Sequence, residues 1–385
     1  MNIVLVYGSY PVVNSGGGGV VSQLLLEYRR LGHQVKLYSF YDLPEWLPFK
    51  AKWVVFPYFV VAYLAGLAWK QKIDVVDISS GDAWLWAMTR RTLRNDAVLV
   101  TRSHGLQHLH HLEALEEESR GRLRLSWKYP LYHGGLRLWE VANSFRHADL
   151  ALFLNRHELD YAVEALDVRP EHARTVANGI PDTFLDLPFA ATPASGDDSI
   201  RIAVIGSYIR EKGVGYAAPA LDRVLLRHSE VQVSFLGARC PADQILVDYD
   251  PLVRARIRVV PSYTRTELPT LLEGHHIKLF PTLSEGFGMA LLEAMACGLA
   301  PVVTFTPGPL EFVRDGHDAL VIPRRDSQAI EQVLERLIVD RALLQRLRHN
   351  ARATAQAYGW SRIAHQTLQL YEEFLRDRKQ RGTSK

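Results

Sequence analysis

The stretch from Ile277 to Pro301 constrains the fold of this chain more than any other segment. Ile277 to Phe280 predicts a short buried strand. Gly286 and Gly288 indicate a tight turn, because glycine accepts backbone angles that other residues resist. Met289 to Cys297 contains good helix formers and no helix breaker, so it predicts a helix. A strand, a glycine turn and a helix N-terminus leave backbone N–H groups free, and we therefore expect an anion-binding site here.

Two glutamates in this stretch could bind two different parts of one ligand. Glu285 precedes the predicted helix and Glu293 lies inside it. Eight helical residues separate the two carboxylates by at most ~12 Å along the helix axis. A nucleotide diphosphate on the turn could therefore present its ribose to one carboxylate and a sugar to the other, since a carboxylate accepts hydrogen bonds from two neighbouring hydroxyls. The alternative is a surface carboxylate and a helix-face carboxylate beside glycines that serve only a turn.

The motif in this stretch resembles that of a known family. Ser284-Glu-Gly-Phe-Gly, a second glutamate eight residues on, and Glu293-Ala-Met-Ala-Cys-Gly-Leu-Ala-Pro-Val-Val are similar to the signature of glycosyltransferase family 4. The match is gapless here, and weaker similarity covers nearly the whole chain. The resemblance implies a retaining, nucleotide-sugar-dependent enzyme with the α/β fold called GT-B, in which two Rossmann-like, doubly wound domains face a central cleft.

Length and composition agree with two soluble domains. A chain of 385 residues is too long for one ordinary core. Its 48% hydrophobic and 23% charged residues are typical of globular proteins, and a formal net charge of +3 gives no indication of nucleic-acid binding. Cys240 and Cys297 are too few for a disulfide framework, and Met1 leads directly into an apolar strand without a signal peptide. We therefore expect a cytoplasmic protein.

The predicted elements place the domain boundaries. Strands at Asn2 to Tyr7 and Gln34 to Phe40, with a helix from Val20 to Leu31 between them, open a doubly wound sheet. We expect an acceptor-binding domain over residues 1–190. A linker over 191–199 is rich in small and helix-breaking residues, and a nucleotide-sugar-binding domain follows over 200–360. By the resemblance, a final helix over 361–378 packs back on the first domain.

In the first domain the resemblance assigns a role to a glycine run and to a histidine. Gly16, Gly17 and Gly18 follow the first strand and would approach the diphosphate of the donor, although a surface loop would have the same composition. His104 follows the strand Ala97 to Thr101 at the sheet edge where ligands bind. The resemblance makes His104 the active-site histidine that contacts the transferred sugar. The alternative is a packed or surface histidine.

In the second domain the resemblance points to a phosphate clamp. Lys212 matches the family lysine that pairs with the donor diphosphate, and a lysine suits phosphate as a compact charge. Ser207 stands where the family has an arginine. Arg210 lies on the same loop in a different register and is the candidate to replace it. Tyr263 is a candidate neighbour of the nucleobase. Solvated loop charges are the alternative for Lys212 and Arg210.

The resemblance also assigns roles to the two glutamates and to the glycine turn between them. By the resemblance Glu285 orients the sugar and Glu293 holds the ribose. The turn and helix start would neutralise charge that develops on the leaving diphosphate; they comprise Gly286, Phe287, Gly288 and Met289. No metal and no cofactor other than the nucleotide sugar are expected. Four nearby histidines, His104, His108, His110 and His111, invite a zinc hypothesis, but no cysteine or spaced carboxylate completes a site.

Two segments of the first domain suggest contact with a membrane. Trp53 to Trp69 carries no charge and approaches the length of a membrane span. Pro57 fits best at a helix start, which leaves a shorter helix that is buried or lies on a surface. Ser119 to His147 is basic and aromatic, which suits either a solvated helix face or a surface for anionic lipid or an anionic acceptor. We expect peripheral contact with the inner face of the membrane.

Together these features predict transfer of a hexose, with retention, from a nucleotide-diphosphate sugar to a hydroxyl of a glycan, a lipid-linked acceptor or a small molecule. Polysaccharide or other glycan biosynthesis is the expected setting. One alternative is a nucleotide-sugar epimerase of the same architecture, for which Asp82 is the one additional carboxylate available near the sugar. Another is an inactive glycosyltransferase-like subunit, which the serine at Ser207 favours. The sequence leaves the sugar, base, acceptor and oligomeric state open.

Overall fold

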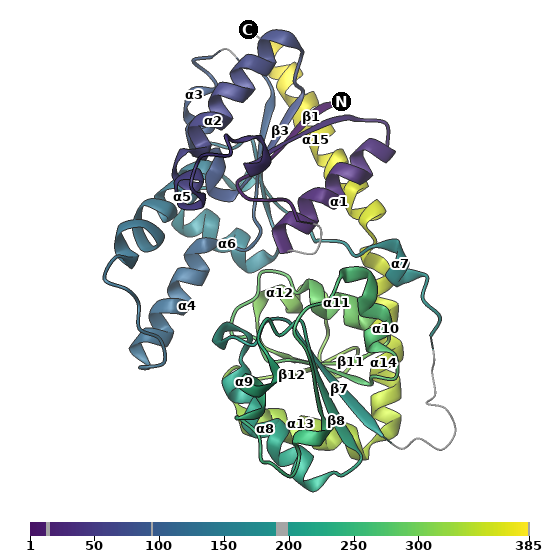
Figure 1. Ribbon diagram of the computed structural model, residues 1–385. Coiled ribbons are helices and arrows are strands. Elements are labelled where there is room, and N and C mark those ends of the chain that lie inside the picture. Colours follow the sequence, from purple (N-terminus) through teal and green to yellow (C-terminus); the bar gives the residue numbers. More distant parts are fainter. Residues whose placement is uncertain (13–15, 94, 190–198, 384–385) are drawn as a thin grey trace. The chain divides into compact units, whose positions relative to one another are not determined.

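The computed structural model describes residues 1–12, 16–93, 95–189 and 199–383 of the chain. Their contacts divide into two compact units, each built on its own sheet (Figure 1). Unit 1 comprises Met1–Gly179 and Trp360–Lys385, and unit 2 comprises Ile180–Gly359. The chain thus passes into unit 2 ahead of the expected boundary at residue 190. The expected linker, residues 191–199, lies outside the described residues except for Ser199.

Unit 1 contains a parallel sheet of six strands in the order β2-β1-β3-β4-β5-β6. The strands are β1 (Asn2–Tyr7), β2 (Gln34–Ser39), β3 (Val75–Ser79), β4 (Val98–Arg102), β5 (Leu150–Phe153) and β6 (Ala173–Thr175). Because β1 pairs with both β2 and β3, the strand order reverses at β1, as in a doubly wound sheet. Every residue of β3 and β4 is buried, as expected for strands covered on both faces.

Helices cover both faces of this sheet, with α1 beside α15 and α2 beside α3 (Figure 1). The helices of unit 1 are α1 (Gly16–Arg30), α2 (Phe49–Lys70), α3 (Trp84–Thr89), α4 (Gln107–Ser119), α5 (Arg137–Arg146), α6 (Arg156–Ala165) and α15 (Trp360–Thr383). The last helix is fixed to the sheet by a buried polar network. The Tyr371 hydroxyl donates to Asp77 in β3 and accepts a hydrogen bond from Arg102 in β4 at 3.1 Å. Arg102 and Asp77 also form a 2.8 Å ion pair, which satisfies both buried charges.

Several helix boundaries in unit 1 differ from the sequence prediction. We expected the glycines from Gly16 onward in a loop and a helix from Val20, but α1 already begins at Gly16. After β3 the chain forms a 3₁₀ turn, η2 (Ser80–Ala83), which is followed directly by the short α3. Asp82 accepts hydrogen bonds from the Gly8 backbone and from Arg137, and these tertiary contacts hold the turn in place.

The prediction that Pro57 starts a helix is wrong, because Pro57 lies inside the 22-residue α2. Phe56, Val60 and Leu64 on this helix are fully buried in the core cluster that includes β1 and β3. Tertiary packing of this apolar face therefore outweighs the helix-breaking tendency of one proline. The basic segment from Ser119 to His147 also differs from one solvated helix face. It contains two short helical turns, η3 (Tyr129–Leu131) and η4 (Tyr132–Leu136), before α5.

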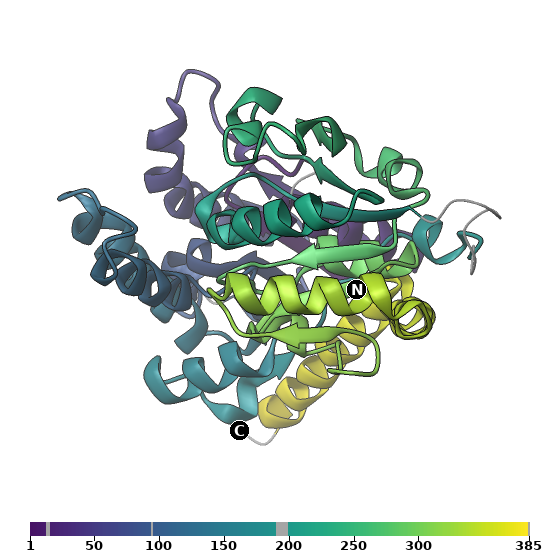
Figure 2. The same ribbon diagram turned by 90° about the horizontal axis from the view of Figure 1, so that it is seen from below.

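Unit 2 repeats the architecture with six parallel strands in the order β12-β11-β10-β7-β8-β9. The strands are β7 (Ile200–Ile205), β8 (Val231–Leu236), β9 (Ile257–Val260), β10 (Ile277–Phe280), β11 (Ala300–Thr304) and β12 (Leu320–Ile322). The helices are α7 (Asp182–Leu185), α8 (Val214–Arg227), α9 (Ala242–Leu246), α10 (Leu268–Leu272), α11 (Met289–Ala296), α12 (Pro307–Leu310), α13 (Ser327–Val339) and α14 (Arg341–Ala355). Helices α8 and α13 are neighbours, and Figure 2 shows both of them from the side. Leu221, Leu334 and Leu344 bury their side chains in the core under the sheet.

Candidate active site

Most of the predicted donor-binding residues follow strands of unit 2 at the point where each strand ends. β7 continues through Gly206 and Ser207 into the 3₁₀ turn η6 (Arg210–Lys212). β10, which pairs in parallel with β7, continues into the predicted glycine turn and α11. The carboxyl ends of parallel strands lie at one edge of a sheet, where ligands of open α/β folds bind. The sheet therefore brings the phosphate-clamp loop and the glycine turn to the same edge.

Two hydrogen bonds join these two loops. The Leu283 N–H and the Thr282 hydroxyl both donate to the carbonyl oxygen of Glu211, each at 3.0 Å. Gly213 closes η6 with φ +70° in the left-handed region, where a β-carbon would lie 1.9 Å from the carbonyl oxygen of Pro281. Only glycine permits this close approach of backbones. The loop that carries Lys212 is thereby fixed against the end of β10.

Lys212 and Glu285 form an ion pair, with the Lys212 Nζ 2.7 Å from the Glu285 Oε2. The two side chains remain 34% and 19% exposed, respectively, so a ligand can reach both. The sequence analysis assigned these residues to different parts of a donor and did not predict that they meet. A cation paired with a carboxylate directly before a glycine turn can bind a phosphate, while the carboxylate binds a sugar hydroxyl next to it.

The glycine turn is held from two sides. Gly288 has φ +102° and caps α11, as the turn prediction requires. Gly308 in α12 donates its N–H to the Glu285 carbonyl oxygen at 3.2 Å. The Phe287 side chain is buried and packs on Phe312 with ring centroids 5.2 Å apart. Phe287 can therefore serve a ligand only through its backbone. Met289 is half-buried at the start of α11 and Gly286 lies on the turn itself.

A second group of predicted residues meets at Glu293. The Glu293 Oε1 lies 3.0 Å from the Nε of Arg265, a residue that the sequence analysis did not identify. Burial raises the pKa of Glu293 to about 7, although the Arg265 charge acts to lower it. Burial and the nearby Glu293 charge also raise the pKa of the Tyr263 hydroxyl. Glu293, Arg265 and Tyr263 thus form one cluster, and their contact with a nucleoside stays a prediction.

Arg210 and Ser207, the two positions considered for a second cation beside Lys212, differ in environment. Arg210 is exposed at the start of η6, two residues before Lys212. Ser207 is half-buried and lines a small cavity beside Lys212. The neutral Ser207 lines this cavity together with Lys212, at the position where the family that the sequence resembles has an arginine.

Unit 1 brings a separate set of residues together at the carboxyl ends of β1, β3 and β4. The His104 Nε2 lies 3.0 Å from the Ser79 hydroxyl, and the imidazole meets the Tyr7 ring edge to face at 5.8 Å between centroids. Burial, helped by the positive charge of Arg102, lowers the pKa of His104 to about 4. His104 is therefore a neutral imidazole at pH 7. Tyr7 and Ser79 were missed, and their positions at strand ends were the available signal.

The glycine run lies beside this histidine. A β-carbon on Gly17 would lie 3.3 Å from the His104 Cγ and 3.0 Å from the Tyr7 hydroxyl. Gly16 and Gly18 flank Gly17 in the first turn of α1, whose leading N–H groups have no partner within the helix. The run therefore supplies a helix N-terminus beside His104 rather than the loop that we expected.

Asp82, the carboxylate needed by the epimerase alternative, is already occupied. Its Oδ2 accepts the Gly8 N–H at 2.9 Å, and its Oδ1 lies 3.1 Å from Arg137, which also pairs with Glu140. Arg137 is itself buried and is therefore not one of the surface cations of the basic segment. A carboxylate that holds a backbone N–H and a buried guanidinium is poorly suited to act on a sugar.

The zinc hypothesis finds no support in the geometry. Within residues 1–12, 16–93, 95–189 and 199–383, no three His, Cys, Asp or Glu side chains are grouped so as to hold a metal ion. Of the four histidines considered, His104 contacts Ser79 and His111 lies 3.1 Å from the Tyr129 hydroxyl.

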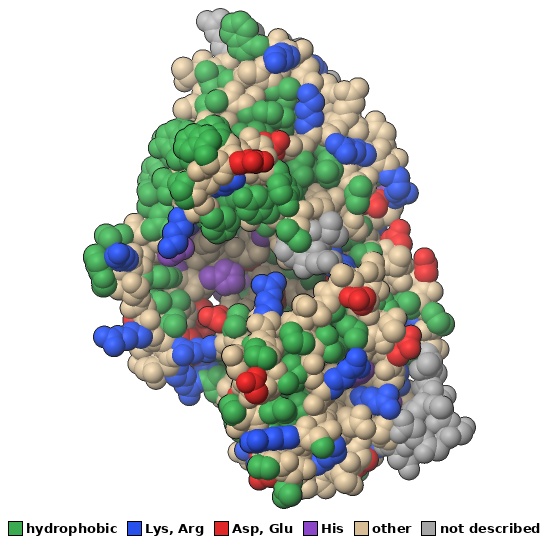
Figure 3. All heavy atoms as spheres, in the orientation of Figure 1, with side chains coloured by type: hydrophobic (Ala, Val, Ile, Leu, Met, Phe, Trp, Pro, Cys, Tyr) green, Lys and Arg blue, Asp and Glu red, His purple; other side chains and the backbone are tan. Residues whose placement is uncertain are grey.

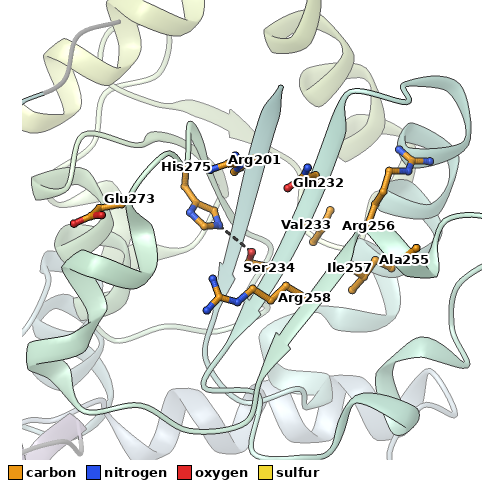
Figure 4. A pocket seen from close by; sticks show the side chains of 10 residues that line it. All are labelled: Arg201, Gln232, Val233, Ser234, Ala255, Arg256, Ile257, Arg258, Glu273 and His275. Carbon is orange, nitrogen blue, oxygen red and sulfur yellow. Dashed lines mark hydrogen bonds between the residues drawn. The ribbon is translucent and has the colours of Figure 1, made fainter. Parts of the chain in front are cut away.

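A larger cavity of ≈ 270 Å³ in unit 2 lies away from this edge (Figure 4). It is lined by residues near the amino ends of β7, β8 and β9, among them Arg201, Gln232 and Ile257. His275 points toward Ser234 there and contacts its hydroxyl at 2.9 Å. None of the predicted site residues lines this cavity, so we do not assign it to the donor.

Known proteins are similar to unit 2 in sequence and to nearly the whole chain in fold. Residues 190–354 match the family described as "Glycosyl transferases group 1". A D-inositol 3-phosphate glycosyltransferase of Streptomyces bingchenggensis is 35% identical over 121 residues, which are 31% of this chain and 26% of the relative. The chain thus spans about a quarter of the length of this curated relative.

Two solved structures show the fold over nearly the whole chain. The sucrose-phosphate synthase of Thermosynechococcus elongatus superposes with a TM-score of 0.79 at 19% identity, covering 98% of this chain and 100% of that one. The Anabaena protein Alr3699/HepE, solved in complex with UDP, gives 0.71 at 15% identity, with 97% and 100% covered. Two parallel Rossmann-like units define the GT-B class. Within it, residues 190–354 of this chain, which lie in unit 2, are similar to the group 1 glycosyltransferases.

Proposed function

We propose that this protein is a retaining, metal-independent glycosyltransferase that moves a hexose from a nucleotide-diphosphate sugar to a hydroxyl group. The observation that carries the proposal is the Lys212–Glu285 ion pair, set at the glycine turn within the matched glycosyltransferase region. Together with the N–H groups of the turn, Lys212 would stabilise the negative charge that develops on the departing diphosphate. This stabilisation needs no metal ion.

The other residues take the remaining parts of the reaction in this proposal. Glu285 orients the hexose beside the diphosphate. Glu293, with Arg265 and Tyr263 next to it, binds the nucleoside of the donor. In unit 1, His104 is the candidate contact for the transferred sugar, as a hydrogen-bonding neutral imidazole rather than a cation. No residue is assigned as a covalent nucleophile, because Glu285 precedes α11 and Glu293 lies on that same helix, so they do not form the opposed pair of a retaining hydrolase.

The first test is binding of UDP-, GDP- and ADP-sugars to the purified protein with divalent cations chelated. The panel includes UDP-glucose because the neighbouring Anabaena structure is a UDP complex. We expect selective binding of one donor with a Kd in the range of about 1 μM to 1 mM, which is usual for enzyme substrates. Calorimetry of the folded protein is the measurement. Absence of binding to the whole panel, or binding only with added magnesium, would contradict the proposal.

We propose further that unit 1 rests on an anionic membrane and takes its acceptor there. By length and composition α2 is the one helix among the described residues that could cross a membrane. Because its inner face is part of the core of unit 1, a position on the membrane surface fits better than a span. Its outward stripe is apolar where surface helices are normally polar; it comprises Val54, Tyr58, Ala62, Gly66 and Trp69.

The charges around this stripe favour an anionic lipid surface over a protein partner. Lys50 and Lys70 stand at the two ends of the stripe, and no charge lies between them on that face. Trp46 and Trp69 are 78% and 93% exposed, as aromatic side chains at a lipid interface are. Figure 3 shows hydrophobic side chains gathered over the region of α2 and α3. Such a position agrees with the expected location at the inner face of the membrane.

Co-sedimentation with vesicles tests this contact. We expect binding to vesicles that contain phosphatidylglycerol, weaker binding to pure phosphatidylcholine, and loss of about tenfold in affinity for the double variant Tyr58→Ser, Trp69→Ser, because two large apolar side chains no longer enter the lipid. Leu252→Ser in unit 2, also at an exposed position, is the matched control and should bind as the wild type does. Self-association of the protein without vesicle binding would show that the stripe is instead a protein interface.

A further inference from the structure

Unit 2 contains a lysine that packing alone does not explain. Lys278 is the second residue of β10, and its side chain is 0% exposed. Within the described residues its Nζ has no hydrogen-bond partner. Lysine is almost never fully buried without one, because an unpaired buried polar group costs stability. A side chain retained at such a cost calls for a role beyond filling the core.

Lys278 lies beside the proposed donor site. Its Nζ is 5.3 Å from the centroid of the Phe280 ring, and the Nζ of Lys212 is 5.9 Å from the same centroid. Lys212 and Lys278 also line one cavity together with Gly206 and Ser207. They are the two lysines in the sequence of unit 2, residues 180–359. Both lysines of the unit therefore lie close together, Lys212 on η6 and Lys278 on the neighbouring strand β10.

The surroundings of Lys278 set its charge. Burial lowers the pKa of Lys278 well below that of a free lysine, and the neighbouring Lys212 charge lowers it further, while Glu285 acts in the opposite direction. Lys212 on η6 and Glu285 on the glycine turn are the charged groups that act on it in the described part of the unit. A new negative charge placed beside Lys212 would therefore raise the affinity of the Lys278 amine for a proton.

We propose that Lys278 is the second cation of the donor site, taking up one proton from solvent when a nucleotide diphosphate binds beside Lys212. The proposal rests on the proposed donor site of unit 2. It assigns to Lys278 the positive charge that the neutral Ser207 does not supply. The amine gains the proton, no covalent bond to the ligand forms, and the proton returns to solvent when the diphosphate leaves.

Lys278 acts through its charge rather than by touching the ligand. The shared cavity measures ≈ 10 Å³, which is room for about one water molecule and too little for a phosphate. A charge held in a buried position is screened far less than an exposed one. The exposed Arg210 is therefore the weaker candidate for the second cation. Lys278 is in this sense a positioning residue that works together with Lys212.

The test compares Lys278→Met with the wild type by calorimetry at pH 8. UDP, GDP, ADP and inorganic pyrophosphate are the probes, each in two buffers of different ionisation enthalpy. We expect the variant to bind the preferred diphosphate about tenfold more weakly, which is about 1.4 kcal/mol. It should also take up fewer protons than the wild type, by as much as one. Subtracting the variant from the wild type removes the protonation of the ligand itself. Arg223→Met, which removes an exposed cation on α8, is the control and should bind like the wild type.

Stability separates this role from a structural one. An amine whose pKa is lowered by folding binds more protons in the unfolded chain, so it destabilises the fold below the pKa of free lysine. Lys278→Met should therefore be at least as stable as the wild type at pH 8, and weaker binding cannot then be blamed on misfolding. Equal affinity and equal proton uptake in variant and wild type would overturn the role of Lys278 and leave the donor site standing. If the wild type binds none of the four probes, the donor site and the role of Lys278 fail together.

Discussion

Glu285→Gln is expected to reduce glycosyl transfer by about 10²–10³-fold, the usual loss when one electrostatic contact to a transition state is removed. The substitution keeps the size of the side chain and a carbonyl oxygen but removes the negative charge. Binding of the nucleoside diphosphate should remain or become tighter, because the Lys212 ammonium, now 2.7 Å from the Glu285 carboxylate, would lose its internal partner and be free for phosphate. Transfer rates and nucleotide affinity are measured side by side.

Glu211→Gln is the matched control for this variant. Glu211 lies on η6 next to Lys212 and carries the same charge as Glu285, but its side chain is exposed, and it is its backbone carbonyl that accepts hydrogen bonds from Thr282 and Leu283. The control should keep wild-type transfer. Full activity of Glu285→Gln would sink the assignment of Glu285. Absence of transfer in the wild type, with every donor that it binds, would instead favour the inactive-subunit alternative.

Gly213→Ala is expected to destabilise unit 2 by about 2–4 kcal/mol, a value at the upper end for single substitutions. Gly213 has φ +70°, which costs a residue with a β-carbon about 1–2 kcal/mol. The new β-carbon would also lie 1.9 Å from the Pro281 carbonyl oxygen, so the backbones must separate. Because that separation moves Lys212 away from the end of β10, nucleotide binding should be lost as well. Urea denaturation and calorimetry measure the two effects.

Gly215→Ala provides a close control, two residues along the chain. Gly215 is the second residue of α8, and apart from its two chain neighbours and the backbone of the helix itself no atom lies within 4 Å of the position that a β-carbon would take, so alanine fits there. Alanine has a higher helix propensity than glycine, and the control should gain up to about 1 kcal/mol. Unchanged stability and nucleotide affinity in Gly213→Ala would show that the contact between η6 and Pro281 does not hold the site together.

The two units and the glycine turn were predictable because their signals are local. The apolar run at Ile277–Phe280, the glycines that follow and the helix formers after Gly288 specify β10, the turn and α11 from neighbouring residues alone. Lys212 and Glu285 could also be picked out, since each sits in a recognisable loop motif. The GT-B fold class predicted from these motifs is confirmed by the two parallel sheets and their structural neighbours.

The contacts between distant residues could not be predicted in this way. Lys212 and Glu285 are far apart in sequence, as are Ser79 and His104, and no local pattern records that they meet. The helical start of α1 at Gly16 and the continuation of α2 through Pro57 were decided by packing on the sheet.

Lys278 shows most clearly what the sequence determined and what the tertiary structure determined. The sequence by itself determined that residue 278 lies in a short strand, because the flanking residues are apolar and the glycine turn follows. Only the tertiary structure decided that this lysine is buried without a hydrogen-bond partner and shares a cavity with Lys212. The physical reason is that a strand residue's burial and charge depend on which loops and strands pack beside it. Its own neighbours in sequence do not carry that information.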